Sequence, residues 1–470
     1  MSTLGELSKR VTQADEYEEL GLGPAARSRK KRIWQQIVKT LAKSFRARRD
    51  EEVYAYFVPG RVEVLGKHTD YAGGKSLLMA LDRGFQGVSR INNTTKIRIM
   101  DINPRYGLRE FEFAERLQPS IGPWENYAMT VAQRAAANFA AYQKLRGVDI
   151  VFASDLPGAG GMSSSSALIV FTFLALAAPN NLFENPIYKE NISNNIDLAM
   201  YLACVENGQT FRSLVGGRGV GTFGGSEDHT TMLTAKRGML SVFEFCPTRH
   251  IADIQFPSDL AMVVAHSGVK AEKTGDAKEH YNLASRRASL VVDCYNERYG
   301  TKHNVMRDII VENEGLDFAR LRNRVRKAIA GQPEKTQGLD LMGRFAQFYL
   351  EDRVYIPEAV AALVGHDYAR LGRIIDQSHA ASKRSLRNIV PEIDYLQRKA
   401  RELGAIAASG FGAGFGGSAY ALIRLDRLRD FVSKWRNVYL DSFPERRRGA
   451  LFFGVTASQG ATRLFTHLPQ

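Results

Sequence analysis

The stretch LPGAGGMSSSSA, residues 156–167, combines three glycines with four consecutive serines and leads directly into the apolar run at 168–178. Glycines let the backbone approach a ligand closely and turn its N–H groups inward. The start of a helix adds unpaired N–H donors and a partial positive charge, which favour an anion such as phosphate. The serine hydroxyls can cap the helix or coordinate a hard cation. The stretch predicts a phosphate-binding loop, and its alternative interpretation is a serine-rich cap before a buried helix.

The size and composition of the chain are those of a globular protein with more than one core. It has 470 residues, of which 44% are hydrophobic and 24% charged, so we expect two domains. The apolar run is well short of the roughly 20 residues that a membrane span needs, and the N-terminus has no apolar signal core. Cys204, Cys246 and Cys294 show no metal or disulfide spacing, which favours a reducing compartment. We therefore expect a cytoplasmic protein that does not bind a membrane.

The chain is basic, with 64 Lys and Arg against 50 Asp and Glu and a formal net charge of +14. Part of the excess lies in three clusters, at 27–32, 46–49 and 446–448. Such a balance suits nucleic acid, a membrane surface or an anionic small molecule. Because no signature of a nucleic-acid module accompanies the clusters, we interpret them as solvated helix faces. Nucleic-acid binding is the alternative, and a steep salt dependence of retention would be its signature.

Residue patterning indicates a charged helical extension followed by alternating strands and helices. Strand-like sequence begins at Val53 and runs to the polar loop KHTDYAGG at 67–74. Further strands are expected within 86–102, 108–114 and 148–153, and helices at 124–146, 166–177 and 195–213. After a glycine-dense loop at 216–225 new strands begin, and from 275 to 403 the chain reads as mainly helical. We expect an extension over 1–50, one domain over 51–240 and a second over 241–470.

Besides the serine-rich stretch, three segments have residue types that suit chemistry. PGRVEVLGKHTDYAGG at 59–74 ends a strand in short polar side chains that could bind a polyol, or form an Asx-type turn. GGSEDHTTML at 224–233 places Asp228 in a glycine-framed turn, where an acidic residue is also a common turn former. GFGAGFGGS at 410–418 allows a close backbone approach, as does any flexible hairpin. The serine-rich stretch has no GK[ST], so it is not a Walker loop.

Together and in this order, these segments resemble the galactokinase branch of the GHMP kinases, the superfamily of galactokinase, homoserine kinase, mevalonate kinase and phosphomevalonate kinase. The first family motif reads approximately GRVNxxGEHTDYxGG, against GRVEVLGKHTDYAGG here. The second reads LPxGxGLSSSA, against LPGAGGMSSSSA, and the third reads GxGFGG, against GAGFGG at 412–417. The resemblance covers about residues 50–425. It implies an α+β, two-lobed GHMP kinase fold with an N-terminal ribosomal-S5-like βαβ lobe and a C-terminal ferredoxin-like lobe.

The resemblance also implies roles on the nucleotide side of the site. The phosphates of ATP are expected to be cradled by Gly158, Gly160, Gly161, Ser163 and Ser164. Ser165 matches the serine that ligates magnesium, and Glu206 matches the glutamate that completes the metal site. Asp228 matches the aspartate that accepts the proton of the sugar hydroxyl, and Arg61 the arginine that steadies the developing charge. This division of roles fits phosphoryl transfer, in which positioning and charge neutralisation dominate.

On the sugar side, the chain departs from the family motif. Asp70 matches the residue that holds two adjacent ring hydroxyls, Tyr281 a tyrosine that contacts the ring, and His68 the motif histidine. Lys67, however, replaces the glutamate that reaches the terminal hydroxymethyl group of the sugar, and Glu63 replaces an asparagine. An ammonium only donates hydrogen bonds, whereas a carboxylate only accepts them. A sugar with a carboxylate at C6, such as galacturonate, or a pentose without C6 would therefore suit Lys67.

The expected function is the magnesium- and ATP-dependent phosphorylation of the anomeric hydroxyl of a monosaccharide, with galactose as the first candidate. The alternatives are a 1-kinase for galacturonate or L-arabinose, as Lys67 suggests, and a sensor that binds sugar and ATP without turnover. A sensor without turnover is free to lose the residues that catalysis needs. This chain retains Arg61, Ser165, Glu206 and Asp228, which argues against the sensor. The expected partners are ATP and a monosaccharide, without nucleic acid or membrane, and the expected state is a monomer or weak homo-oligomer.

Overall fold

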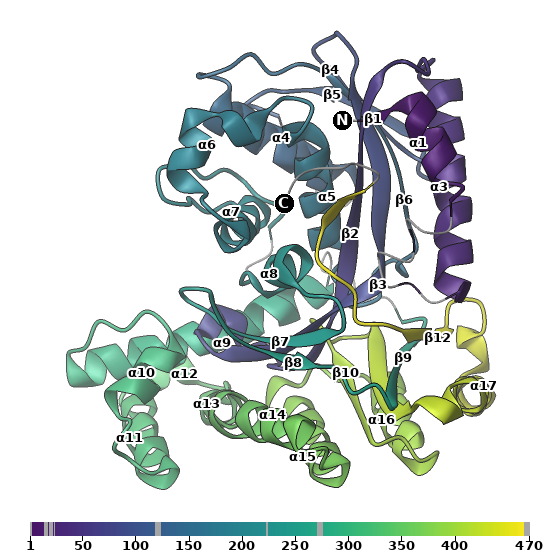
Figure 1. The fold of residues 1–470 in the computed structure, drawn as a ribbon. Helices are drawn as coiled ribbons and strands as arrows, with labels where there is room; N and C mark the ends of the chain where they lie inside the picture. Colours follow the sequence, from purple (N-terminus) through teal and green to yellow (C-terminus); the bar gives the residue numbers. More distant parts are fainter. Residues whose placement is uncertain are drawn as a thin grey trace.

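A computed structural model of the chain describes residues 2–13, 17, 22, 24–117, 124–221, 224–269 and 276–464, with only the backbone described at 24–25 and 276–281. Two β-sheets organise the molecule (Figure 1). The larger sheet occupies the upper part of the view, and helices cover both of its faces. The smaller sheet lies below it, among helices from the C-terminal half of the chain. The mixed α/β architecture predicted from the motifs is confirmed.

The larger sheet has nine strands around a long central hairpin. Its main path runs β1 (Ser2–Thr3), β2 (Glu52–Leu65), β3 (Lys75–Ile91), β6 (Val148–Ser154), β4 (Lys96–Asp101) and β5 (Leu108–Glu112). In addition β13 (Thr462–Leu464) pairs with β2, β7 (Met239–Glu244) pairs with β3, and β8 (Arg249–Gln255) pairs with β7. The pairing is antiparallel except between β4 and β6. β2 and β3 are buried along nearly their whole length, because helices cover both faces.

The apolar run after the four serines forms α5 (Ser164–Ala177), whose residues from Ser166 onward are all buried. A helix that is apolar on every side belongs in a core, and α5 packs on β2 and β3. The same face of the sheet carries α4 (Glu125–Phe139), α6 (Pro186–Asn191), α7 (Asn195–Asn207) and α8 (Glu227–Thr234). The predicted helices and the strand at 148–153 are thus present, with shorter ends for α4 and α7.

The N-terminal extension covers the opposite face of this sheet. α1 (Leu4–Arg10) and α3 (Pro24–Ser44) pack there in a separate apolar cluster with residues of β2, β3 and β6. Ile37, Leu41 and Phe45, which share one helix face at the predicted spacing, are buried in this cluster. Figure 1 shows α3 running along the outer side of the sheet. The extension is therefore part of the N-terminal core.

The smaller sheet has four antiparallel strands in the order β10 (Ala407–Phe411), β11 (Ser418–Arg424), β9 (Leu260–His266) and β12 (Leu451–Val455). α16 (Pro391–Glu402) and α17 (Leu428–Ser442) pack on it with Trp435 and Phe431 fully buried. The chain order β9, α16, β10, β11, α17, β12 is a split βαβ arrangement. The predicted ferredoxin-like lobe is confirmed.

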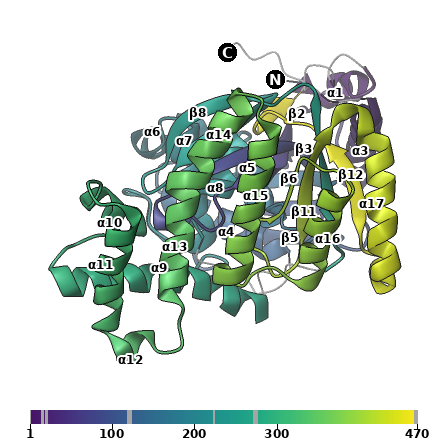
Figure 2. The ribbon, with the colours of Figure 1, turned by 90° about the horizontal axis from the view of Figure 1, so that it is seen from below.

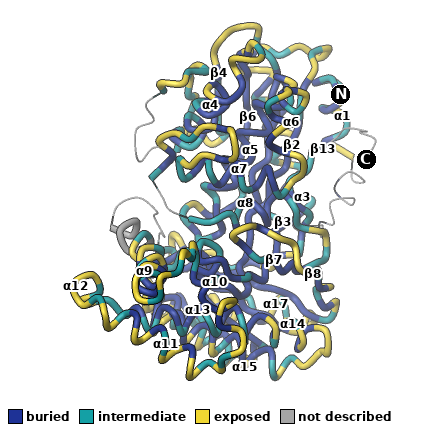
Figure 3. Tube along the Cα trace, turned by 90° about the vertical axis from the view of Figure 1, so that its left-hand side faces the viewer, coloured by how far each residue is buried: buried dark blue, intermediate teal, exposed yellow. Residues whose placement is uncertain are grey.

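The expected helical segment lies between β9 and β10. It contains α9 (Asp276–Tyr299), α10 (Met306–Glu312), α11 (Phe318–Ala330), α12 (Pro333–Thr336), α13 (Leu341–Leu350), α14 (Ile356–Val364) and α15 (Tyr368–Ala381). Seen from below, α14, α15, α16 and α17 lie next to one another, and α10, α11 and α12 stand apart from them (Figure 2). Exposed residues lie on these outlying helices and in the surface loops, whereas the central strands β2 and β3 are buried (Figure 3). Among the described helices, none has the length and apolarity that a membrane crossing requires.

The domain limits differ from those predicted at residue 240. β7 pairs with residues 75–78 of β3, and β8 pairs with β7, so the larger sheet extends to Gln255. Both ends of the chain return to this sheet through β1 and β13. The glycine-dense loop before β7 resembles a linker in composition, but strand pairing, which composition does not encode, assigns β7 and β8 to the first lobe.

One basic cluster is partly buried, contrary to our interpretation of all three as solvated, because Lys30 and Arg29 turn toward the sheet. Lys30 is 2% exposed, and its Nζ lies 2.9 Å from Asp155 Oδ1. Arg29 Nε lies 2.7 Å from Asp155 Oδ2, and the backbone N–H of Gly84 donates to Oδ1 at 2.8 Å. Although burial opposes ionisation, the charges of Lys30 and Arg29 lower the pKa of Asp155. The side chain directly before the phosphate stretch thus fastens α3 to the sheet, whereas most residues of the other two basic clusters are exposed.

We expect Asp155→Asn to lower the free energy of unfolding at pH 7 by about 3–5 kcal/mol, because it leaves the buried ammonium of Lys30 without its carboxylate. The pKa of Asp155 is lower in the folded state, so the difference from wild type should shrink as the pH falls below the ordinary value of 3.8. Urea titrations at several pH values would measure both effects. Arg48→Ala, which breaks the exposed pair with Asp50, is the control and should leave the midpoint unchanged. A midpoint for Asp155→Asn equal to that of wild type would contradict the role of this cluster.

Candidate active site

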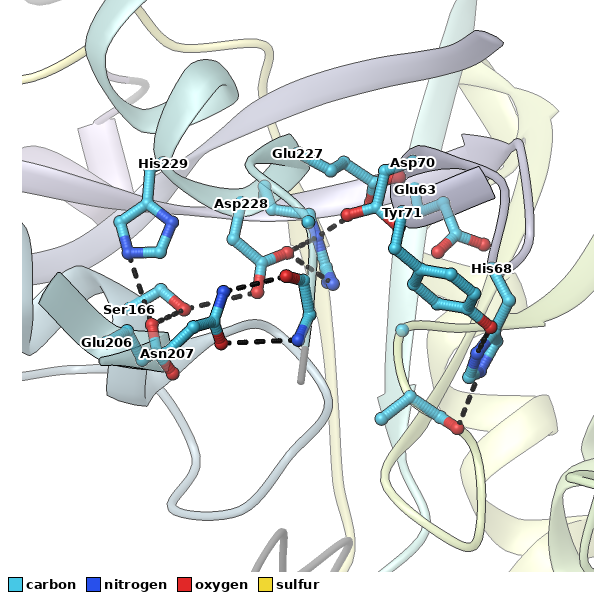
Figure 4. A pocket seen from close by; sticks show the side chains of 15 residues that line it. Glu63, His68, Asp70, Tyr71, Ser166, Glu206, Asn207, Glu227, Asp228 and His229 are labelled. Atoms are coloured by element: carbon cyan, nitrogen blue, oxygen red, sulfur yellow. Dashed lines mark hydrogen bonds and ion pairs between the residues drawn. The ribbon is translucent and has the colours of Figure 1, made fainter. Parts of the chain in front are cut away.

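A pocket between the two sheets collects residues from five segments that are distant in sequence (Figure 4). Its lining comprises Arg61, Glu63, His68, Asp70, Tyr71, Ser166, Glu206, Asn207, Gly224, Gly225, Glu227, Asp228, His229, Gly412 and Ala413. The structure therefore brings together five of the residues predicted from the motifs, namely Arg61, His68, Asp70, Glu206 and Asp228. Asp228 lies in the first turn of α8, where the sequence suggested a turn before a strand.

Two irregularities in β2 set the positions of Arg61 and Glu63. The pairing of β2 with β3 shifts register between Pro59 and Arg61, and again between Glu63 and Leu65. Bulges of this kind bend a strand and re-aim its side chains. Residues 61 and 63 are two apart and so share one face of the strand. Both therefore project into the pocket from a strand that is otherwise buried.

Arg61 connects the acidic centre of the pocket to the predicted phosphate loop. Its Nε donates to Asp228 Oδ1 at 2.8 Å, and its Nη1 donates to the backbone oxygen of Gly161 at 2.7 Å. Glu227 Oε1 lies 3.5 Å from the same guanidinium. Although burial opposes its charge, the carboxylates of Asp228 and Glu227 raise the pKa of Arg61 above its ordinary value. Arg61 is thus a fixed positive charge at the junction of two candidate ligand sites.

The predicted metal ligands need one correction. Ser166 Oγ donates to Glu206 Oε2 at 2.8 Å and to Asp228 Oδ2 at 3.2 Å, and Ser166 lines the pocket. Ser165, the predicted ligand, is not among the described lining residues, because neighbouring helix positions face different directions. The chain has four serines where the motif has three, so the alignment is ambiguous by one position.

The oxygen atoms of Ser166 and Glu206 fit a hard cation. Magnesium binds to proteins through one or two carboxylates and takes its remaining ligands from phosphates and water. In the described part of the chain, no group of three or more His, Cys, Asp or Glu side chains could hold a metal by itself. His229 Nε2 lies 3.1 Å from Glu206 Oε2, so the imidazole is next to this carboxylate. His229 flanks Asp228 in the quoted segment, yet the sequence analysis assigned it no role.

The phosphate stretch has the predicted geometry of a loop that enters a helix. Gly161 has φ +75°, and Ser163 occupies the N-cap of α5 with φ +55°. The side chain of Ser163 makes no capping hydrogen bond, so the alternative interpretation as a serine cap is not supported. Ser418 Oγ donates to the backbone oxygen of Gly160 at 2.6 Å. The glycine loop of the smaller sheet thus supports the phosphate loop of the larger one.

The same hairpin of the smaller sheet also contacts the loop after β2, in which Asp70–Ala72 form a short 3₁₀ turn. His68 Nε2 lies 3.1 Å from the backbone oxygen of Ala413, and His68 Nδ1 lies 2.9 Å from the hydroxyl of Tyr71. Tyr71 lines the pocket although the motif comparison assigned it no role. The two loops are thereby held together on the side of the pocket where the sugar residues were predicted.

Three buried residues, in α13 and directly after it, hold the loop after β2 in place. Arg344 Nη2 donates to the backbone oxygen of His68 at 2.6 Å, and Gln347 Nε2 donates to that of Lys67 at 2.9 Å. Glu351 Oε2 accepts from the N–H of Gly66 at 3.0 Å. These residues could not be found from the sequence, because they lie almost 300 positions from the loop that they contact and belong to no local motif.

Lys67, predicted to face the sugar, points elsewhere. Its side chain is buried, and Nζ donates to the backbone oxygen of Gly410 at 2.8 Å. It does not belong to the described lining of the pocket, whereas Glu63 does. The remaining predicted sugar residue, Tyr281, lies in α9, and its side chain is outside the described residues.

The pocket is strongly acidic. Five carboxylates line it, from Glu63, Asp70, Glu206, Glu227 and Asp228, with Arg61 as the one arginine or lysine among the described lining residues. Burial raises the pKa of Glu63 to about 7. Burial and the charge of Asp228 raise the pKa of Asp70, and burial with the charges of Glu63 and Asp70 raises that of Glu227 well above its usual range. A ligand that donates hydrogen bonds, or a cation, relieves this accumulation of negative charge.

Comparison with known proteins extends the motif resemblance to nearly the whole chain. Three family models match, the GHMP kinases N terminal domain at 126–210, GHMP kinases C terminal at 359–441 and the galactokinase galactose-binding signature at 42–88. The galactokinase of Dictyostelium discoideum is 22% identical over 92% of this chain and 94% of its own length. That of Roseiflexus sp. (strain RS-1) is 26% identical over 86% of this chain and 92% of its own length. The crystal structure of Lactococcus lactis galactokinase complexed with galactose has the same fold, with a TM-score of 0.73 at 20% identity over 91% of this chain and 98% of that one.

The raised carboxylate pKa values predict a stability that falls between pH 5 and pH 8 in protein without metal or nucleotide. A group whose pKa is higher in the folded state binds more protons there, so unfolding becomes easier as the pH rises. We expect Glu227→Gln to reduce this fall by about 1 kcal/mol or more, because glutamine keeps an acceptor for Ser76 Oγ and removes the buried charge. Urea titrations at pH 5 and pH 8 would measure it.

The matched control is Asp197→Asn. Burial raises the pKa of Asp197, but hydrogen bonds from Ser193 and the charge of Arg212 outweigh this effect, so the pKa of Asp197 is lowered. This carboxylate is therefore ionised in both the folded and unfolded states above pH 5, and its removal should change stability equally at the two pH values. An identical pH dependence for Glu227→Gln and wild type would contradict the acidic-cluster interpretation.

Proposed function

Because this chain belongs to the GHMP kinases, and to their galactokinase-like branch, we propose that it transfers the γ-phosphoryl group of ATP to the anomeric hydroxyl of galactose. The observation that carries the proposal is the position of Asp228 between Arg61 and Ser166. One oxygen of this carboxylate binds the arginine, which also contacts the phosphate loop. The other oxygen receives a hydrogen bond from the serine beside Glu206. A proton acceptor, a phosphate loop and a cation-binding pair therefore meet within a few ångströms.

In the proposed reaction Asp228 accepts the proton of the sugar hydroxyl while the phosphoryl group is transferred. Arg61 keeps Asp228 oriented, and its bond to Gly161 keeps the phosphate loop at a constant distance from the acceptor. Phosphoryl transfer requires little covalent chemistry from the protein, so this positioning supplies most of the catalysis. The buried setting strengthens these charge interactions relative to water.

The nucleotide is expected to bind at the start of α5, with its phosphates against the loop of Gly158, Gly160, Gly161, Ser163 and Ser164. Ser166 and Glu206 are the residues that would hold magnesium there, and a bound magnesium ion would neutralise charge on the phosphate oxygens. Ser165, on a neighbouring face of the helix, has no part in this arrangement.

The sugar is expected to lie against Asp70, His68 and Tyr71. A Cβ at Gly225 would stand 2.4 Å from Asp70 Oδ2, so glycine at this position gives the carboxylate its room. Carboxylates accept the hydroxyl hydrogens of a neutral sugar but repel an anionic one. The acidity of the pocket therefore favours galactose over galacturonate, the substrate that Lys67 suggested. Cytoplasmic location and a monomeric or weakly oligomeric state stay predictions.

The first test is ADP release by the purified protein with magnesium-ATP and galactose, galacturonate, L-arabinose or glucose. We expect turnover with galactose, and we expect Asp228→Asn to lower kcat about 10²–10⁴-fold, the usual range for loss of a proton acceptor. Thermal shift with galactose would check that the variant still binds the sugar. ATP binding without ADP release for any of the four sugars would favour the non-catalytic sensor instead.

A second test separates the two adjacent serines. Ser166→Ala should raise the magnesium concentration needed for half-maximal activity by at least about tenfold, since it removes an oxygen from the proposed cation site. Ser165→Ala, the same change one residue earlier, should have a much smaller effect. Magnesium titrations of both variants at saturating ATP would measure this. The opposite order of effects would restore the assignment of Ser165.

A further inference from the structure

We propose that Glu63 is a specificity-determining residue of the sugar site, supplying the carboxylate that the family motif places at the position of Lys67. The inference rests on the proposed galactose phosphorylation and adds a residue to it. It follows from two departures from the motif that lie four residues apart, a glutamate in place of asparagine and a lysine in place of glutamate. Taken together, the two departures move the carboxylate from position 67 to position 63, so that the site still contains one.

Lys67 cannot offer its ammonium to the sugar in this structure. The side chain is 2% exposed, and its Nζ donates to the backbone oxygen of Gly410 in the smaller sheet. Among its carboxylate neighbours is Glu63, with Nζ of Lys67 3.7 Å from Oε1. Burial and the charge of Lys67 lower the pKa of the adjacent His379 to about 4, so the histidine is neutral at pH 7 and does not oppose the ammonium. Lys67 thus connects the loop after β2 to β10.

Glu63, in contrast, has free acceptor capacity within the pocket. The residue is 3% exposed, lines the pocket and lies near Asp70 and His68 (Figure 4). Its Oε1 is buried and has no hydrogen-bond partner in the described structure. A buried carboxylate without a hydrogen-bond donor is costly, and a ligand hydroxyl in the pocket that Glu63 lines would supply one to this carboxylate. The ion pair with Lys67 fixes this oxygen within 3.7 Å of the ammonium that occupies the glutamate position of the motif.

The exchange predicts which sugars are accepted. A hydroxymethyl group can donate a hydrogen bond to Glu63, whereas a carboxylate at the same carbon would face Glu63 with a like charge. A methyl group at that carbon would leave the Glu63 carboxylate without a donor. The order of preference is therefore galactose first, with 6-deoxygalactose and galacturonate well below it.

The decisive experiment compares kcat/KM for galactose and 6-deoxygalactose in wild type and Glu63→Gln. Because burial raises the pKa of Glu63 to about 7, the assay is run at pH 8, where wild type should prefer galactose by about tenfold or more, the usual value of a hydrogen bond to a charged acceptor. In Glu63→Gln the preference should fall to about threefold or less, with most of the loss on galactose. An undiminished preference in Glu63→Gln, with both sugars reduced by the same factor, would overturn the proposal, because a merely structural carboxylate affects both sugars alike.

Glu351→Gln is the matched control. Glu351 is also a buried carboxylate in the electrostatic environment of Lys67, but it binds the N–H of Gly66 and is absent from the described lining of the pocket. Its replacement should reduce kcat/KM for both sugars by the same factor and leave their ratio unchanged. If Glu351→Gln changed the ratio of kcat/KM for galactose to that for 6-deoxygalactose as much as Glu63→Gln does, the preference would depend on the loop after β2 and not on Glu63, and the proposal would be overturned.

Two further measurements remain available if Glu63→Gln does not fold. The double exchange Glu63→Asn with Lys67→Glu restores the motif arrangement and should retain the preference for galactose over 6-deoxygalactose, and its loss would overturn the proposal. Wild type itself should use galacturonate at least about tenfold less well than galactose. A preference for galacturonate would overturn the role of Glu63 while leaving the sugar kinase intact, whereas no ADP release with any sugar would overturn the proposed function itself.

Discussion

The guanidinium of Arg61 is the charge on which the arrangement of the pocket depends. It is buried in a region that also holds Glu227 and Asp228, and it donates to the backbone of the phosphate loop. Without a cation at this point, several buried carboxylates would repel one another in a medium of low dielectric. The cation therefore does two things at once. It makes the acidic pocket tolerable in the folded state, and it aligns the proton acceptor with the phosphate loop.

The pocket is assembled between lobes by backbone and side-chain contacts of the glycine hairpin at 410–418. This hairpin accepts a hydrogen bond from Lys67, lies against His68, and supports the phosphate loop through Ser418. The packing leaves no room for side chains at the contact, since a Cβ on Gly412 would stand 2.4 Å from the backbone oxygen of Gly161. The third glycine motif thus contacts both the phosphate loop and the loop after β2, and it fixes the position of one relative to the other.

The acidic character of the pocket fits the chemistry that we propose. A neutral polyol offers only hydroxyl groups, and carboxylates are their strongest acceptors. In the proposed reaction, positive charge on the nucleotide side would come from Arg61, from the start of α5 and from a cation held by Ser166 and Glu206. The basic clusters of the chain take no part, and Arg29 and Lys30 instead fasten the N-terminal helix to the sheet through Asp155. Net charge was therefore a poor guide to the ligand.

The sequence by itself determined the phosphate loop, the buried helix behind it, the strand–loop motif after Val53 and the family, because each depends on residues close together in the chain. It also singled out Asp228, Glu206, Arg61 and Asp70, whose motifs are local and which the structure places in one pocket. Only the tertiary structure decided which of two adjacent serines faces Glu206, where Lys67 points, and which sheet β7 and β8 join. The physical reason is that these outcomes depend on the direction of a side chain and on partners far along the chain, such as Gly410 and Arg344. Local patterns specify the segments, and packing between segments specifies what each side chain meets.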